Sequence, residues 1–380
     1  MSISRQCARR AAVLAALAVV SVSGIAAARA DALLQETIGF TGQILFLEHK
    51  VPALVIGAVR NDQIFVEGFG ERSDTDKHAP DGNTLMRIGS ITKAFTGEML
   101  ASLAADGTVN PADPLIERAP QFAPDKGIRL VDLATHSAGL PREVPHEPGP
   151  PDNPFVHITQ KAFADWLKTK PLLFKPGSGV LYSNFGFDLL AAALSDAAKK
   201  PYPALLHERI TGPLKMADTT FTPSAAQKAR LMQGHNFDGK ALPDVPTVSA
   251  IVGSGGLYST PNDLLRWMQW HLDRYVAQDA ETRLLDHAIY RVRDGLDPVS
   301  GMDESGHMDG MGLGWVAMMP KGNRPFILQK AGGLQGTFSY IAFAPARGVA
   351  VFIAINKFDF GAAMAMAATA NDLIATLAPR

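Results

Sequence analysis

A serine and a lysine three residues apart carry the strongest chemical signal in this sequence. The tetrapeptide Ser90-Ile91-Thr92-Lys93 would place a hydroxyl and an amine on one face of a helix, one turn from each other. A serine hydroxyl is a weak nucleophile until a nearby base takes its proton, and a neutral lysine amine can be that base. Chance also supplies this spacing for about one serine in twenty at ordinary lysine abundance. The pair therefore predicts covalent catalysis only in company with other groups.

Two segments further along the chain offer such groups. Tyr182-Ser183-Asn184 precedes an apolar run, which predicts a loop leading into a helix. Its phenol could shuttle a proton and its amide could bind a substrate, although a buried tyrosine usually only satisfies its own hydroxyl. Lys330-Ala331-Gly332-Gly333 ends a predicted strand, and its glycines allow a close backbone approach to a ligand. These segments add proton-transfer groups and a possible backbone donor to the serine–lysine pair.

The histidines and glycines give no comparable signal. The ten histidines form no His-Glu-x-x-His pattern, and we predict neither a metal site nor a cofactor. His136 is expected to be hydrogen-bonded scaffold. The glycine run from Gly310 to Gly314 is not followed by a βαβ unit, which argues against a dinucleotide site.

The N-terminus has the pattern of an export signal. Arg5, Arg9 and Arg10 precede an apolar run over 11–22, and Ala28-Arg29-Ala30 resembles a cleavage site. We therefore predict a signal peptide over 1–30 and a periplasmic mature protein; an uncleaved membrane anchor is the alternative. Cleavage would remove the only cysteine and lower the formal net charge from −1 to about −5, which does not suit a nucleic-acid surface. The rest of the sequence has no run of about 18 uninterrupted apolar residues, so we predict no integral membrane segment after the signal peptide.

Hydrophobic periodicity predicts strands at both ends of the chain and helices between them. The expected helices cover 90–105, 260–272 and about 362–377, and the proline-rich stretch 141–154 is expected to be a surface loop. This order predicts an α+β fold (an α/β sandwich), in which N- and C-terminal strands build one antiparallel sheet flanked by helices, with a large helical region inserted. We expect one catalytic domain over 31–380, its sheet from about 31–80 and 310–380 and its helical part over 81–309. The expected strands cover 52–59, 63–69, 325–329, 337–344 and 349–356.

In their order along the chain, the serine, tyrosine and lysine segments resemble the three motifs of the penicillin-binding protein and β-lactamase superfamily of serine acyl-transferases. A tyrosine at the head of the second motif is similar to the class C branch. Within it, the segments 139–143, 264–269 and 312–315 look most like the periplasmic D-alanyl-D-alanine carboxypeptidase/endopeptidases of class C type (AmpH-like). The resemblance implies a β-lactamase/transpeptidase-like fold, hydrolysis of peptidoglycan D-alanyl peptides and covalent binding of β-lactams.

The same resemblance implies a role for each matching residue. Ser90 would attack the substrate carbonyl, and Lys93 and Tyr182 would handle the protons, with the identity of the base left open. Lys330 would stabilise a tyrosinate or meet the substrate carboxylate, and a cation about 4 Å away would lower the pKa of a second lysine by roughly three units. Asn184 would hold a substrate amide.

The oxyanion hole follows from the third motif. The resemblance assigns Gly332 and Gly333 to substrate binding and the oxyanion hole, with the backbone N–H groups of Ser90 and Gly333 as donors. Each such donor can contribute roughly 3–4 kcal/mol to transition-state stabilisation.

Ala331 departs from the family pattern, which commonly has a hydroxyl residue at this position to hold the substrate carboxylate. Loss of a hydrogen bond to a charged group costs about 1.5–3 kcal/mol, or roughly ten- to a hundredfold in affinity. The departure favours the alternative of a class C-type β-lactamase or esterase on the same scaffold. A non-catalytic penicillin-binding receptor is a third possibility, which the intact serine, lysine and tyrosine oppose.

Overall fold

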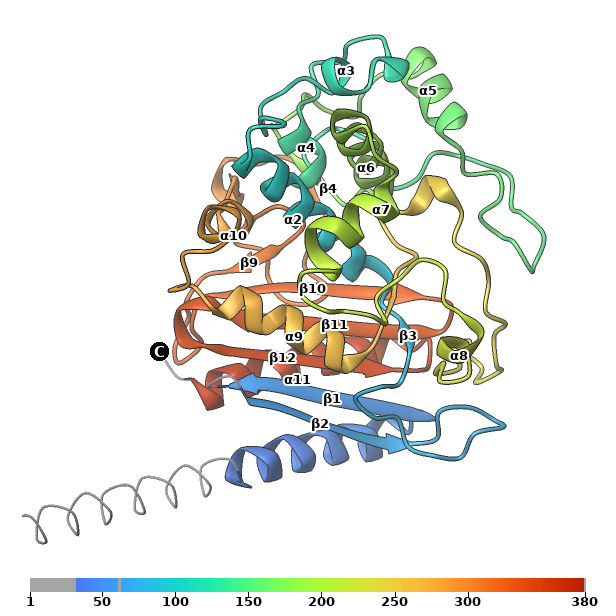
Figure 1. The fold of residues 1–380 in the computed structure, drawn as a ribbon, viewed down its shortest axis with the longest axis vertical. Coiled ribbons are helices and arrows are strands. Elements are labelled where there is room, and N and C mark those ends of the chain that lie inside the picture. Colours follow the sequence, from blue (N-terminus) through green and yellow to red (C-terminus); the bar gives the residue numbers. More distant parts are fainter. Residues whose placement is uncertain (1–31, 61–62, 379–380) are drawn as a thin grey trace, which may run out of the picture.

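The computed structural model describes residues 32–60 and 63–378. An eight-stranded antiparallel sheet with the order β2-β1-β12-β11-β10-β9-β8-β6 forms its centre (Figure 1). The first strand of the chain pairs with the last, so that Leu54 lies opposite Ile355. The predicted α+β architecture, with a sheet built from both ends of the chain, is therefore confirmed. The long strands are β1 (Ala53–Arg60), β2 (Gln63–Gly70), β10 (Ile327–Leu334), β11 (Thr337–Ala344) and β12 (Val349–Ile355).

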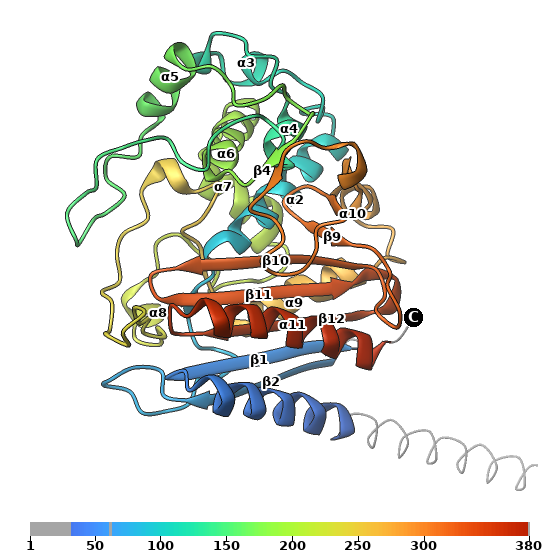
Figure 2. The same ribbon diagram turned by 180° about the vertical axis from the view of Figure 1, so that it is seen from behind.

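Both faces of the central strands are covered. Every residue of β12 is buried, and its side chains alternate between two hydrophobic cores. Phe352 faces the core beside α9 (Pro261–Leu272), whereas Val351 and Ile353 face the core beside α11 (Phe360–Leu377). Figures 1 and 2 show these two helices on opposite faces of the sheet. Burial on both sides explains why β1 and β12 are almost continuously apolar.

Two helices cover the face of the sheet opposite α9. A helix over residues 32–49, which the sequence analysis did not predict, packs Leu34 and Ile38 into the same core as α11 (Figure 2). A Cβ atom at Gly42 would lie 2.6 Å from the Ile56 side chain, so close packing here needs a residue without a side chain. Glycine fills this position although its helix propensity is low. By length and composition α11 could cross a membrane, but in the fold it lies along β11 and β12 and buries Ala370 there.

The helical region lies on the β10 side of the long strands and is centred on α2 (Thr92–Ala105), which is buried on almost every side. The sequence predicted a helix that starts at Ser90; instead, Ser90 lies in a short 3₁₀ turn, η1 (Gly89–Ile91), directly before α2. The predicted loop over 141–154 contains neither helix nor strand. The short strands β6 (Arg291–Val292), β8 (Gly310–Met311) and β9 (Val316–Met318) belong to the sheet, and η6 (Pro345–Arg347) joins β11 to β12. The other described elements are β3 (Met86–Arg87), α3 (Leu115–Arg118), η2 (Pro120–Phe122), α4 (Leu130–Ala134), α5 (Gln160–Thr169), β4 (Val180–Leu181), α6 (Asn184–Ala198), α7 (Tyr202–Leu206), η3 (His207–Thr211), α8 (Ala225–Lys228), η4 (Ser249–Ile251), β5 (Tyr258–Ser259), α10 (Ala280–His287), η5 (Arg293–Gly295) and β7 (Val299–Ser300).

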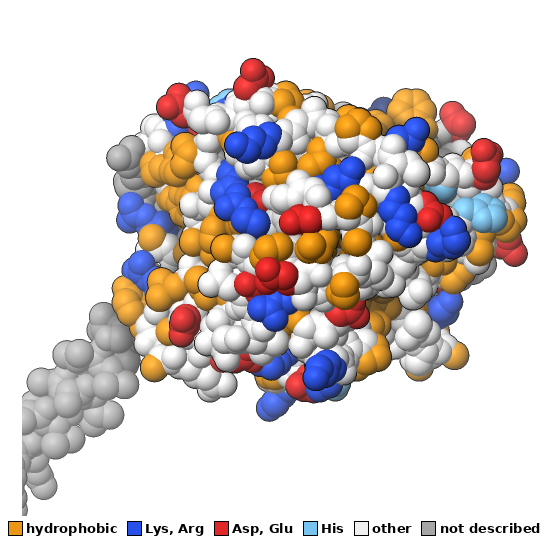
Figure 3. All heavy atoms as spheres, turned by 90° about the horizontal axis from the view of Figure 1, so that it is seen from above, with side chains coloured by type: hydrophobic (Ala, Val, Ile, Leu, Met, Phe, Trp, Pro, Cys, Tyr) orange, Lys and Arg blue, Asp and Glu red, His pale blue; other side chains and the backbone are white. Residues whose placement is uncertain are grey.

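The surface over the helical region carries charges of both signs. On the face in Figure 3, lysine and arginine side chains are interspersed with aspartate and glutamate. A surface that binds nucleic acid instead gathers positive charge on one face. This face therefore agrees with the near-neutral composition of the whole chain, whose formal net charge is −1.

Candidate active site

Ser90 lies in the turn where α2 meets the edge of the sheet. The preceding residue, Gly89, has a φ of +50°, and a Cβ atom there would lie 2.5 Å from the backbone nitrogen of Gly333. Only glycine satisfies both the conformation and the close approach without strain. The Thr92 hydroxyl donates a hydrogen bond of 2.7 Å to the Gly89 carbonyl and so closes the turn. The turn thereby presents the Ser90 hydroxyl directly beside β10.

The Lys93 amine is held against Ser90. Its Nζ donates to Ser90 Oγ at 2.9 Å and to the Ser254 carbonyl at 2.6 Å, and the side chain is completely buried. The Ser254 backbone N–H donates in turn to Asp188 Oδ1 at 2.8 Å. The hydroxyl–amine contact that the sequence spacing predicts is therefore present, and Asp188 supports it through the Ser254 backbone.

Burial brings the amine into a useful range of pH. Desolvation lowers the pKa of Lys93 from 10.5 to about 7, while the charges of Asp188 and Glu143 act in the opposite direction. The sequence analysis attributed such tuning to the charge of a neighbouring lysine, whereas in the structure desolvation is the dominant cause. At neutral pH a large fraction of Lys93 is therefore neutral and able to accept the Ser90 proton.

Tyr182 lies between the two lysines. The Nζ atoms of Lys93 and Lys330 are each 4.9 Å from the centre of its ring, and the Arg142 guanidinium is 4.6 Å away. The Tyr182 ring also stacks on the His136 ring, with 4.6 Å between the ring centres. Three cationic groups thus surround the phenol, as a proton-transfer group between two amines requires.

His136 has a structural role in this arrangement. Its Nδ1 accepts a hydrogen bond of 2.9 Å from the backbone N–H of Ser183, the residue that caps α6. Burial and the nearby Lys330 and Lys93 charges hold the pKa of His136 well below its ordinary value of 6.5. A neutral His136 therefore fixes the segment that carries Tyr182 and Asn184.

Strand β10 brings the third motif to the nucleophile. Lys330 is almost fully buried on this strand, and burial lowers its pKa below the ordinary value of 10.5, an effect that Tyr182 opposes. A Cβ atom on Gly332 would overlap the Ile88 carbonyl and lie 3.0 Å from the Ser90 nitrogen. The glycines therefore allow the strand and the η1 turn to touch at the place where the predicted oxyanion donors, the N–H groups of Ser90 and Gly333, would act.

Asn184 is the first residue of α6, and a neighbouring carboxylate fixes its orientation. Its Nδ2 donates to Glu143 Oε1, while its Oδ1 is buried and has no hydrogen-bond partner within the described part of the chain. Its backbone N–H donates to the Arg142 carbonyl at 2.8 Å. The contact with Glu143 thus leaves Asn184 Oδ1 unpaired, and Asn184 itself does not line the cavity over Ser90.

A cavity of about 320 Å³ opens over these groups. Ser90, Tyr182 and Lys330 line its polar part together with Arg142, and Ala331 is also in its wall. The wall also includes a cluster of three phenylalanines with ring centres 4.8–5.5 Å apart. The site thus combines cationic groups near the nucleophile with room for an apolar part of a substrate. The three aromatic residues are Phe338, Phe358 and Phe360.

Comparison with known families agrees with this geometry. The family model described as Beta-lactamase matches residues 26–376. The chain belongs to the beta-lactamase family. In this chain of the serine hydrolase family, Ser90 and Lys93 are in contact, and the Lys93 amine lies 4.9 Å from the centre of the Tyr182 ring.

Individual members of the beta-lactamase family are similar over most of their length. The D-alanyl-D-alanine-carboxypeptidase/endopeptidase AmpH of Escherichia coli K12 is 39% identical over 344 residues, which cover 88% of this chain and 86% of that protein. A beta-lactamase of Pseudomonas fluorescens is 24% identical, covering 85% of this chain and 94% of its own.

Solved structures agree. A beta-lactamase/D-alanine carboxypeptidase from Yersinia pestis, complexed with citrate, matches with a TM-score of 0.81 and 37% identity, covering 91% of this chain and 99% of that one. A class C beta-lactamase matches with a TM-score of 0.78, covering 91% and 98%; at 17% identity it supports the fold alone.

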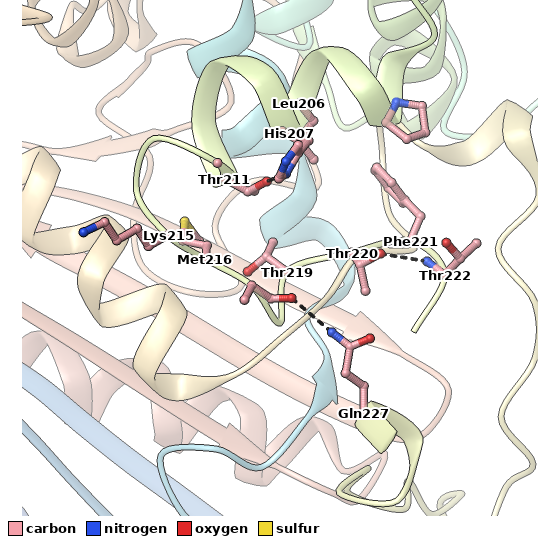
Figure 4. A pocket seen from close by; sticks show the side chains of 13 residues that line it. Leu206, His207, Thr211, Lys215, Met216, Thr219, Thr220, Phe221, Thr222 and Gln227 are labelled. Atoms are coloured by element: carbon pink, nitrogen blue, oxygen red, sulfur yellow. Dashed lines mark hydrogen bonds between the residues drawn. The ribbon is translucent and has the colours of Figure 1, made fainter. Parts of the chain in front are cut away.

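A second cavity, of about 510 Å³, lies away from this site (Figure 4). Its wall includes His207, whose Nδ1 is 3.3 Å from the Thr211 hydroxyl, and Gln227, whose amide donates to the Ala217 carbonyl. None of the predicted site residues lines it. The larger cavity therefore does not contain the serine–lysine pair that sequence and geometry place at the first site.

The sequence analysis missed several residues of the site. Ser254 contributes only backbone atoms, its carbonyl to Lys93 and its N–H to Asp188, and residue type does not predict backbone contacts. Glu143 and Arg142 stood in a segment that resembled the family but received no role, and the fold brings them beside Asn184 and Tyr182.

Proposed function

We propose that this protein is a serine D-alanyl-D-alanine carboxypeptidase/endopeptidase that cleaves peptidoglycan stem peptides through an acyl-enzyme on Ser90. The observation that carries the proposal is the 2.9 Å contact between the buried Lys93 Nζ and the Oγ of Ser90, which lines a cleft. The 39% identity to AmpH over 88% of the chain supports the peptide substrate.

The chemical steps follow from the groups in the cleft. Neutral Lys93, or Tyr182 beside it, takes the Ser90 proton as Oγ attacks the carbonyl carbon. The backbone N–H groups at the contact of η1 with β10 stabilise the oxyanion, and the proton passes to the departing D-alanine amine. Water then attacks the acyl-enzyme and releases Ser90. Asn184 Oδ1 accepts an N–H of the peptide during these steps.

The same nucleophile would react with β-lactams, whose strained amide carbonyl can occupy the position of the peptide carbonyl. Penicillins are therefore proposed as covalent ligands of Ser90. Slow attack of water on that ester would leave a stable adduct, and fast attack would give β-lactamase activity.

Export to the periplasm is part of the proposal. Its support is the pattern of Arg5, Arg9 and Arg10, an apolar run and Ala28-Arg29-Ala30, all of which lie outside the described residues. A periplasmic location would place the enzyme beside its proposed peptidoglycan substrate.

Ala331 is the observation that favours a second candidate, an esterase or class C-type β-lactamase. It lines the cavity without a hydroxyl to bind a substrate carboxylate. Lys330 and Arg142 are the cationic side chains in the same wall that could take over this contact.

Three substrates distinguish the candidates. The purified protein and its Ser90→Ala variant are incubated separately with a D-Ala-D-Ala pentapeptide, a p-nitrophenyl ester and a cephalosporin. We expect D-alanine release by the wild type and none by the variant. Fast turnover of the ester without any D-alanine release would reject the peptidase and select the second candidate.

A further inference from the structure

A buried group of two histidines and two carboxylates lies away from the active site and includes one residue of α2, the helix that also carries Lys93. Glu98 is on α2, His271 is near the end of α9, and Asp286 and His287 end α10. The His271 and Asp286 side chains are 0% exposed, Glu98 is 4% exposed and His287 is 16% exposed. None of these four residues contacts the catalytic cavity, and the proposed reaction does not use them.

Three atoms of this group have the separations of metal ligands. His271 Nδ1 lies 2.9 Å from His287 Nε2 and 3.6 Å from Asp286 Oδ2, and His287 Nε2 lies 3.9 Å from Asp286 Oδ2. A point equidistant from three atoms with these separations is about 2.0 Å from each, which is the usual distance from Zn²⁺ to a histidine nitrogen or carboxylate oxygen. Three ligand atoms therefore already surround a position that an ion of this size would fit.

Two further atoms of the group lack partners. His271 Nε2 and Asp286 Oδ1 are buried and have no hydrogen bond within the described part of the chain. Leaving a buried polar atom unpaired is unfavourable, because the atom loses its contacts with water and gains none in the fold. A metal ion at the equidistant point would give Asp286 Oδ1 a partner, since the carboxylate can bind through both oxygens. His271, bound through Nδ1, would carry its proton on Nε2, which faces Glu98 Oε2 at 3.8 Å, too long for a hydrogen bond.

Tryptophans fix the two carboxylates. Trp315 Nε1 donates to Asp286 Oδ2 at 2.9 Å, and Trp267 Nε1 donates to Glu98 Oε2 at 2.6 Å. Both tryptophans are completely buried, and they are 5.5 Å apart between ring centres. Such outer contacts hold ligand side chains in a fixed orientation and keep water away from a bound ion.

We propose that His271, His287 and Asp286 bind one divalent transition metal ion, with Zn²⁺ the best match. The ligands come from two helices and are separated by 15 residues in sequence, so a search for His-Glu-x-x-His could not find them. Because none of the three ligand residues lines the catalytic cavity, the ion would be structural. It would join α9 and α10 to α2, the helix that also carries Lys93, five residues or about 7.5 Å before Glu98.

Metal content and thermal stability test the site. The full chain is stripped with a chelator, incubated with Zn²⁺, freed of unbound ion by gel filtration and analysed for zinc. We expect about one Zn²⁺ per chain, a rise in Tm of a few degrees on adding the ion, and visible absorption bands of a four-coordinate site after Co²⁺ substitution.

Variants assign the ligands. His287→Gln, at the partly exposed rim, should fold and lose at least tenfold in Zn²⁺ affinity together with the Co²⁺ bands. The matched control is His307→Gln, since His307 is 59% exposed and lies 3.6 Å from both Asp303 and Asp309. The control should bind as the wild type does. No zinc retention and no change in Tm in the wild type, or loss of binding in His307→Gln alone, would overturn the proposal.

Discussion

The pH at which Ser90 becomes reactive should follow from the burial of Lys93. The amine must be neutral to accept the hydroxyl proton, so reactivity appears as pH rises through its pKa. With the ordinary pKa of 10.5, about 0.03% of this amine would be neutral at pH 7; with a pKa of about 7, about half is neutral. Burial therefore increases the concentration of usable base more than a thousandfold.

The assay is the pH profile of acylation. We expect kcat/KM for a chromogenic cephalosporin to rise about tenfold from about pH 6 to a plateau above about pH 8, with its midpoint near pH 7. A profile that is flat over this range, or one whose midpoint lies near pH 10, would refute the argument that burial prepares Lys93 as the base.

Two variants that each remove one charge test the direction in which neighbouring charges move the pKa of Lys93. The Glu143 carboxylate raises the pKa of Lys93, so Glu143→Gln should move the midpoint to lower pH. The Arg142 guanidinium lowers the same pKa, so Arg142→Gln should move the midpoint to higher pH. The plateau rate can change in either variant because both residues adjoin the cleft, but the two midpoints must move in opposite directions. A shift in the same direction would show that neither charge acts through Lys93.

Three other variants test the surroundings of the site. Ala331→Thr should lower KM for a carboxylate-ended peptide by roughly ten- to a hundredfold and leave a neutral ester unchanged, because the new hydroxyl can bond to the carboxylate; equal effects on both substrates would contradict this. Gly89→Ala should abolish acylation and destabilise the fold, because the new Cβ would press on Gly333. The control is Gly107→Ala, where φ is +79° and the surrounding space is open. This control should lower the free energy of unfolding by only about 1–2 kcal/mol. Asp188→Ala should slow acylation by releasing the backbone that holds Lys93, and Asp188→Asn, which keeps an acceptor, should restore most of the rate; a rate equal to that of the alanine variant would contradict a positioning role.

Much of the fold could be predicted because the sheet is buried on both sides. Apolar, β-branched runs bounded by turns predicted β1, β11 and β12 to within a residue or two. The helix over 32–49 escaped notice because Gly39 and Gly42 lower its helix propensity, and their reason is close packing that only the fold reveals. Strand β10 runs beyond its predicted end because its glycines, which usually break strands, admit the η1 turn here.

The candidate site divides in the same way. Ser90, Lys93, Tyr182 and Lys330 could be predicted because their side chains carry the chemistry and stand in recognisable motifs, and the structure brings them together. Contacts made by backbone atoms or between distant segments, such as the Ser254 carbonyl, leave no such pattern. The buried histidine–carboxylate group was missed for the same reason, since its members meet only when α9 and α10 pack against α2.

Mass spectrometry of the intact protein after penicillin treatment tests the central claim most directly. We expect a mass increase of one penicillin per chain in the wild type, mapped by peptide digestion to Ser90, and no increase in Ser90→Ala. An adduct that persists in Ser90→Ala, or one that maps to another residue, would contradict the assignment of Ser90 as the nucleophile.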